Sequence, residues 1–236
     1  MVQQQTRQSP IDITGDYAVH DPDFCAKDKI NVTYVPGDCI EVVATEGRGF
    51  TVNVKDGCKT TLAANHLPGN YELVQFHAHW AECGERGSEH LVKGKAYSGE
   101  VHFVFRNTKY PSFCESLDKE DGLAVLGVFL QEGKHSENYQ PLMEAIKKSS
   151  ESSEPTKLPA SLDIQNLLPN SDDREFITYP GSLTTPPFSE CVIWTVLLQP
   201  VEVSKQQLDV LRSITPANHR GCQSICDRII RCSVNF

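Results

Sequence analysis

The stretch Gln75-Phe76-His77-Ala78-His79-Trp80 alternates between polar and apolar residues, and this alternation is typical of a β-strand. Successive side chains of a strand point to opposite faces, so Gln75, His77 and His79 share one face. The other face is apolar and is predicted to contact the core: Val74, Phe76, Ala78 and Trp80. Two adjacent imidazoles are costly to bury unless something binds them, and a metal ion fits that role.

A second alternating segment, residues 100–105, contains a third histidine on a compatible face. His102 shares that face with Glu100 and Val104. The connection between the two segments is rich in glycine, so the segments can pair as antiparallel neighbours and bring His77, His79 and His102 to one ion. Three neutral imidazoles leave one position of a tetrahedral ion open, which is the arrangement of catalytic zinc. The sequence therefore predicts Zn²⁺ as the cofactor.

Polar neighbours of the histidines strengthen this hypothesis. A ligating imidazole normally donates its second N–H to an oxygen atom, which holds the ring in position. Gln75 and Glu100 each precede a histidine by two residues and are predicted to accept those hydrogen bonds. No side chain is available in this way for His79, so a backbone carbonyl is expected.

Two other interpretations of the histidines stay open at this point. A single His-x-His is more often an ordinary surface or core feature than a metal site. The cupins also bind metal through His-x-His with a following glutamate, here Glu82, but the glycine and proline spacing of their motifs is absent.

The remaining pattern predicts a mainly β protein with a few peripheral helices. Strands are expected at residues 29–34, 40–44, 50–54, 71–80, 100–107, 123–131 and 191–201. Helices are expected at residues 137–148 and 204–214, the second with Ser204 as its N-cap. Residues 149–155 are rich in serine and glutamate and are interpreted as an exposed loop.

Composition excludes several classes of function. The 236-residue chain has a net charge of −9 at pH 7, which argues against a nucleic-acid partner or an anionic membrane surface. No apolar run of about 18 residues predicts a membrane span, and the polar N-terminus lacks a signal-peptide core. The nine cysteines are interpreted mostly as free thiols in a reducing compartment. Cys222, Cys226 and Cys232 could form a second metal site, although their spacing matches no zinc ribbon.

Several segments, in one order along the chain, resemble the α-class carbonic anhydrases. They are residues 8–13, 75–80, 87–90, 100–102, 107–110, 121–130 and 179–187. The resemblance implies a single catalytic domain over residues 1–236, built on a large, twisted, mostly antiparallel sheet. It also implies reversible hydration of carbon dioxide to bicarbonate and a proton by a zinc-bound hydroxide. A monomer that binds sulfonamide- and anion-type inhibitors is expected.

The resemblance also implies roles for individual residues. Thr184 and Glu89 correspond to the family's catalytic pair, in which the threonine accepts a hydrogen bond from the hydroxide and donates its own to the buried carboxylate. The residues expected to form the substrate pocket are Val104, Val125, Leu183, Thr185, Val192 and Trp194.

The chain departs from the family in three places. Arg48 stands where fast members have a proton-shuttle histidine, and an arginine cannot exchange protons near neutral pH. Slower proton transfer is therefore expected, with His66 as an alternative shuttle. The family's aromatic N-terminal segment is missing, which suggests a shortened member.

The third departure concerns location. Secreted members pair two cysteines at the positions of Gln3 and Phe188, so a cytoplasmic location is expected. Two other hypotheses are a weakly active or inactive zinc-binding member with a binding or structural role, and a mineral-associated matrix protein. The matrix protein would show acidic repeats or a signal peptide, and neither is present.

Overall fold

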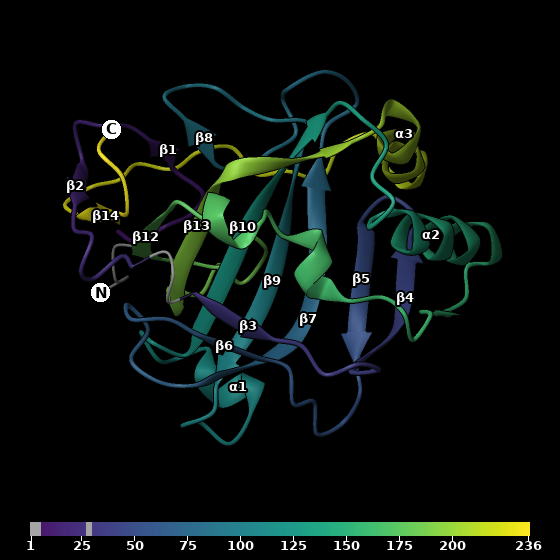
Figure 1. Ribbon diagram of the computed structural model, residues 1–236, viewed down its shortest axis with the longest axis horizontal. Coiled ribbons are helices and arrows are strands. Elements are labelled where there is room, and N and C mark those ends of the chain that lie inside the picture. The colour runs from purple at the N-terminus through teal and green to yellow at the C-terminus, as the bar shows by residue number, and fades with distance from the viewer. Residues whose placement is uncertain (1–5, 27–29) are drawn as a thin grey trace.

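A large β-sheet dominates the computed structural model, which describes residues 6–26 and 30–236. Within this part of the chain, twelve strands form one sheet whose main path runs β11-β4-β5-β7-β9-β10-β13-β12-β14-β2 (Figure 1). Strand β6 pairs with β7 and with β3, beside the main path. A separate parallel pair joins β1 and β8.

The strands have the following bounds. They are β1 (Asp12–Ile13), β2 (Ala18–His20), β3 (Asn31–Thr33), β4 (Cys39–Thr45), β5 (Gly49–Val54), β6 (Thr61–Ala63), β7 (Tyr71–Trp80), β8 (Leu91–Val92), β9 (Gly99–Asn107), β10 (Leu123–Glu132), β11 (Thr156–Lys157), β12 (Phe176–Gly181), β13 (Val192–Val203) and β14 (Ile230–Cys232). The helices are α1 (Phe113–Ser116), α2 (Gln140–Ser152) and α3 (Lys205–Ile214), with 3₁₀ turns η2 (Ile164–Leu167) and η3 (Ser171–Asp173).

The structure confirms the predicted fold class. Most neighbouring strands of the large sheet are antiparallel, and the parallel exceptions among the described strands are β10 with β13 and β14 with β2. Strand β7 has the predicted bounds, and the other predicted strands agree with the structure to within two residues. Lys29, the expected start of the strand at residues 29–34, lies outside the described residues, and the observed strand β3 runs from Asn31.

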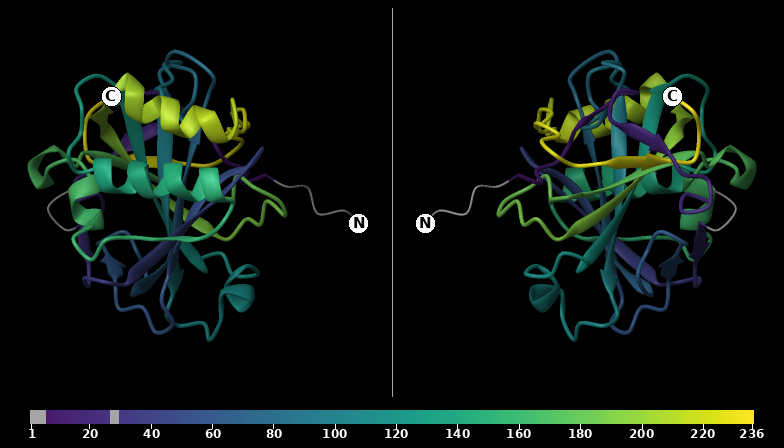
Figure 2. Two further views of the ribbon diagram at one scale, coloured as in Figure 1. Left: turned by 90° about the vertical axis from the view of Figure 1, so that its right-hand side faces the viewer. Right: turned by 90° about the vertical axis from the view of Figure 1, so that its left-hand side faces the viewer.

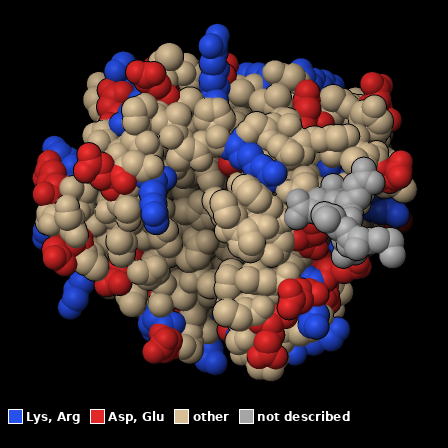
Figure 3. Space-filling view, turned by 180° about the vertical axis from the view of Figure 1, so that it is seen from behind, with Lys and Arg blue, Asp and Glu red and all other residues tan. Residues whose placement is uncertain are grey.

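The two faces of the sheet carry separate apolar clusters. One cluster includes Phe76, Trp80 and Phe103 and continues into α2 and α3, which run across the same side of the molecule (Figure 2). The other includes Val104 and Trp194, on the side of the sheet that also carries the histidines. Seen from behind, the surface has a hollow near its middle, and uncharged residues form the walls of this hollow (Figure 3).

A bulge in β7 corrects the predicted core face. The pairing of β7 with β9 shifts register between Leu73 and Gln75, so Leu73 joins Phe76 in the core and Val74 stays partly exposed. Regular alternation would instead bury Val74. The bulge leaves Gln75 and His77 on the predicted face.

Helix α2 begins three residues later and ends four residues later than predicted, so that residues 149–152, predicted as loop, form its last turn. Ser149 is fully buried there. Its Oγ accepts a hydrogen bond from the Ala44 N–H at 3.0 Å and donates one to the Glu154 carbonyl at 2.7 Å. The serine thus ties the helix to strand β4, a tertiary contact that composition does not reveal.

Strand β12 was not predicted, because Pro180 and Gly181 are typical of turns. Proline has no N–H to donate, yet Pro180 lies opposite Ile193 in the pairing with β13. A Cβ at Gly181 would lie 2.2 Å from Ser9 Oγ and 2.7 Å from a Trp194 ring carbon. Glycine is therefore needed here for close packing and not for a turn.

Candidate metal centre

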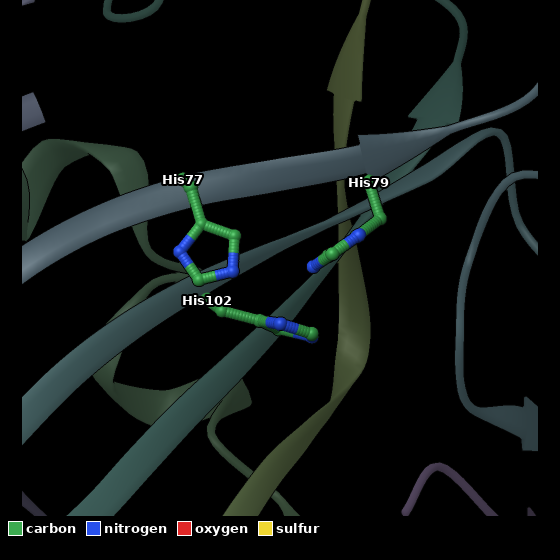
Figure 4. A group of neighbouring side chains, drawn as sticks. All are labelled: His77, His79 and His102. Carbon is green, nitrogen blue, oxygen red and sulfur yellow. The ribbon is translucent and has the colours of Figure 1, made fainter. Parts of the chain in front are cut away.

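Three histidines from two adjacent strands meet at one point. His77 lies directly opposite His102 in the antiparallel pairing of β7 and β9, and His79 follows two residues later on the same face. The ring centroids lie 5.0 Å apart for His77 and His79, 5.4 Å for His77 and His102, and 4.7 Å for His79 and His102. The rings point toward one another, and one ligand atom from each lies within 4.8 Å of the others (Figure 4).

One nitrogen of each ring is held by an oxygen atom, as predicted. His77 Nδ1 lies 2.9 Å from Gln75 Oε1, and His102 Nε2 lies 2.9 Å from Glu100 Oε1. The remaining nitrogens, Nε2 of His77 and Nδ1 of His102, have no hydrogen-bond partner among the described residues. Because each oxygen is an acceptor, it fixes the tautomer that leaves the opposite nitrogen with a free lone pair.

The predicted backbone partner of His79 is the carbonyl of Asn218, which lies 3.0 Å from His79 Nδ1. Its Nε2 is buried without a partner, an unusual situation for a polar atom. The Asn218 side chain accepts from the Trp80 N–H at 2.9 Å and donates to the Ala78 and Arg48 carbonyls, each at 3.1 Å. Asn218 was missed because 139 residues separate it from His79.

The electrostatics favour neutral imidazoles. Burial first, and then the neighbouring His79 and His102, hold the pKa of His77 well below its usual value. Burial also lowers the pKa of His79, although Glu89 opposes this shift. Neutral rings keep the lone pairs that a metal ion requires.

Glu100 is the most highly connected polar group of the centre. Oε1 lies 2.9 Å from His102 Nε2 and 2.7 Å from His90 Nδ1, while Oε2 accepts from the backbone N–H groups of Glu89 and His90. Burial would raise the pKa of Glu100, but the two imidazoles and their hydrogen bonds outweigh it and hold the pKa well below its usual value. His90 in turn lies 2.6 Å from the Tyr179 hydroxyl. His90 and Tyr179 stand in two of the matched segments, where sequence reasoning assigned them no role.

An apolar cavity of about 190 Å³ lies beside His77 and His102. Of the predicted pocket residues, those that line it are Val104, Val125, Leu183, Thr185 and Trp194. Val192 is buried in the same apolar cluster but is not among the lining residues, which corrects its predicted place. Phe113 and Leu117 also line the cavity and were missed. Their spacing of four residues, just after the N-cap Ser112, was the available signal.

The expected contact between Thr184 and Glu89 does not form in this structure. Thr184 lines the apolar cavity, and Glu89 is buried with Oε1 accepting from the Arg220 N–H at 2.7 Å. Its Oε2 has no hydrogen-bond partner. The roles predicted for this pair therefore remain predictions.

The two predicted proton-transfer positions differ in their surroundings. Arg48 is exposed and lines a polar cavity of about 360 Å³ that also contacts His77 and His79. His66 is buried, packs against Phe176 with the two rings tilted and lines a different pocket, so its predicted place as an alternative shuttle at the metal centre is wrong. Its Nε2 lies 2.7 Å from Thr195 Oγ1, on the opposite side of β13 from Trp194.

The cysteines form no second centre among the described residues. All nine are free, and the groups whose atoms approach closely enough for a metal ion contain only histidine and glutamate. Of the positions compared with the secreted disulfide, Gln3 lies outside the described residues and the Phe188 ring packs 4.0 Å from the Arg220 guanidinium. Within the described chain, no helix combines the length and the apolar character needed to cross a membrane.

Comparison with known proteins identifies the family. The profile of the eukaryotic-type carbonic anhydrases matches residues 2–234. The chain belongs to the eukaryotic-type (α-class) carbonic anhydrase family. "Carbonic anhydrase 5B, mitochondrial" from Rattus norvegicus is 36% identical over 240 residues, which cover 96% of this chain and 74% of the relative. Family membership confirms the predicted enzyme class, a carbonate dehydratase that acts on a small-molecule substrate. Carbonic anhydrases of this family depend on zinc.

Proposed function

We propose that this carbonic anhydrase hydrates carbon dioxide reversibly with Zn²⁺ held by His77 Nε2, His79 Nε2 and His102 Nδ1. The main observation behind the proposal concerns the three histidine rings. In each ring, one nitrogen lies next to an oxygen acceptor, and the second nitrogen is the one assigned to the metal. The buried, unpartnered Nε2 of His79 is the atom that a metal would satisfy. Three neutral nitrogen donors suit Zn²⁺ and leave a position free for water or substrate.

Zinc bound in this way would act as a Lewis acid and make water a good nucleophile near neutral pH. The protein's contribution is to hold the three imidazoles neutral and correctly oriented. Gln75, Glu100 and the Asn218 carbonyl perform this orientation. Glu100 is itself fixed by two backbone N–H groups, so its position does not depend on the metal.

We assign substrate binding to the apolar cavity beside the histidines. Carbon dioxide has no net charge, and the Val104, Val125 and Leu183 side chains form a wall that excludes water from one side of the centre. Thr185 lines both cavities and Thr184 lines the apolar one, so both residues lie beside the proposed reacting position. In the proposal, Thr184 orients the attacking water, and Glu89 Oε2, which has no hydrogen-bond partner in the structure, is the atom that would accept the hydrogen bond of the Thr184 hydroxyl.

Proton exit is the slow feature of the proposed mechanism. Each hydration releases a proton. Arg48 lines the cavity beside the histidines, where a side chain that takes up and releases protons could carry this proton to the solvent. A guanidinium remains protonated at neutral pH and cannot relay that proton. The turnover is therefore expected to depend on buffer molecules that enter the cavity.

The remaining parts of the proposal concern the whole chain. One catalytic domain is supported by a sheet that takes strands from both ends of the described chain. A monomer, inhibition by sulfonamides and anions, and a cytoplasmic location remain proposals. The nine free cysteines support a reducing compartment, whereas the name of the rat relative suggests mitochondria as the alternative. Imaging of the tagged protein distinguishes the two locations.

Stopped-flow measurement of carbon dioxide hydration on protein of known zinc content tests the function. One zinc ion per chain and hydration well above the uncatalysed rate are expected. Full zinc loading without activity would contradict the proposal and would favour a binding role, which family membership does not support.

A further inference from the structure

Arg220 contacts two parts of the metal centre that are far apart in the sequence. Its backbone N–H donates to Glu89 Oε1 at 2.7 Å, and its guanidinium lies 4.0 Å from the centre of the Phe188 ring. Glu89 is a buried member of the proposed catalytic pair, and Phe188 belongs to the loop that carries the other member, Thr184. One residue thus joins the surroundings of both.

The loop that carries Thr184 is closed by backbone hydrogen bonds. The Leu183 N–H donates to the Ser189 carbonyl at 3.0 Å, and the Phe188 N–H donates to the Thr185 carbonyl at 2.9 Å. Phe188 has a φ of +60°, which is strained for a residue with a large side chain. A strained residue persists only where its surroundings hold it. The contacts that hold Phe188 therefore also fix the loop of Thr184.

Gln8 and Arg220 supply these contacts together. Arg220 Nη1 donates to Gln8 Oε1 at 3.0 Å and to the Ser9 carbonyl at 2.7 Å. Gln8 Nε2 in turn donates to the Phe188 carbonyl at 3.1 Å. Gln8 and Ser9 are buried, so water does not readily replace these hydrogen bonds. The guanidinium thus ties residues 8 and 9 to the loop of Thr184.

The zinc ligands do not depend on the Arg220 side chain. The nearby Asn218 carbonyl is the partner of His79, but the Asn218 side chain bonds to backbone groups of three other residues and holds that carbonyl in place. Loss of the guanidinium should therefore leave zinc binding intact. What it should change is the position of Thr184 relative to Glu89.

We propose that Arg220 is a positioning residue for carbon dioxide hydration, whose guanidinium fixes the loop of Thr184 relative to Glu89. The inference rests on the roles proposed above for Thr184 and Glu89. In that mechanism Thr184 orients the attacking water, so the step that Arg220 supports is the attack on carbon dioxide. The later exit of the proton does not involve it.

Steady-state kinetics of zinc-loaded R220A tests the proposal. We expect kcat/KM for carbon dioxide to fall by roughly 10- to 100-fold, because small displacements of a positioned group are costly. The kcat in weak buffer should fall less, because proton exit limits it. Q8A removes the other side-chain contact to Phe188 and should show the same split. R231A removes a guanidinium that packs on the Phe24 ring and lines neither cavity of the metal centre, so it should show neither change.

The double variant with T184V separates positioning from folding. R220A should have little further effect on kcat/KM in T184V, because the group that Arg220 positions is already absent. Additive effects, or equal losses of kcat and kcat/KM in R220A, would show that Arg220 only stabilises the fold and would overturn the proposal. Unchanged kcat/KM in T184V would overturn it together with the role of Thr184. A loss in T184V without one in R220A would overturn the role of Arg220 alone.

Discussion

His77 and His102 are directly paired across strands β7 and β9, with their ring centroids 5.4 Å apart. Each has a polar partner two residues earlier on its own strand, Gln75 for His77 and Glu100 for His102. The strand period of two thus positions both a ligand and the group that orients it. Two short sequences on neighbouring strands build most of the centre.

Replacing one orienting group should weaken zinc binding without removing a ligand. In Q75A the His77 ring loses its acceptor, and we expect zinc affinity to fall by roughly 10- to 100-fold. Competition with a chromophoric chelator measures this affinity, with Q206A on the exposed surface of α3 as the control. Unchanged affinity in Q75A would show that the ring is held by other contacts.

A side chain at position 48 that can take up and release a proton should speed the release of protons from the cavity. We expect R48H to raise the turnover in weak buffer by roughly tenfold or more, because histidine titrates near neutral pH. Added imidazole should raise the turnover of the unmodified protein and have less effect on the variant. Equal turnover of the two proteins in weak buffer would mean that proton exit does not limit the rate.

The residues in these two predictions could be found from the sequence, whereas other residues of the site could not. Regular alternation predicted β7, the three histidines and two of their three partners, because each of these partners lies two residues before its histidine on the same strand. The sequence predicted that a backbone carbonyl would bind His79 but did not identify Asn218, since the contact between these two residues depends on how distant segments pack. The sequence likewise does not reveal that His66 lies on the far face of β13, or that Pro180 belongs to a strand.

Asp38 is predicted to stabilise the fold at pH values above the range in which its carboxyl group titrates. Burial alone would raise its pKa, but the hydrogen bonds from Lys55, Thr60 and the Lys59 N–H outweigh this and lower the pKa below its usual value. A carboxyl whose pKa is lower in the folded state stabilises it above the unfolded-state pKa of about 3.9, and this contribution is lost as the pH falls below that value.

The variant D38N should therefore unfold more easily at pH 7, by about 2 kcal/mol. The difference from the unmodified protein should shrink as the pH falls from 5 to 3. Urea unfolding across this range measures it, with D16N on the exposed surface as a comparison. A difference that stays constant with pH would show that the loss does not come from the carboxylate charge.

The buried Ser149 should stabilise the junction of α2 with strand β4. S149A leaves the Ala44 N–H and the Glu154 carbonyl without this partner, at a cost of about 1–3 kcal/mol. Thermal unfolding compares it with S213A, whose exposed hydroxyl bonds only within α3. Equal melting temperatures of the two variants would show that water replaces the lost hydrogen bonds.

Zinc titration of the metal-free protein, with carbon dioxide hydration followed by stopped flow, tests the central claim most directly. We predict that activity rises in proportion to bound zinc and stops at one ion per chain, and that H79A shows neither binding nor activity in the same range. Activity in the metal-free protein, or a zinc-saturated protein without activity, would contradict the assignment of His77, His79 and His102 as the catalytic zinc site.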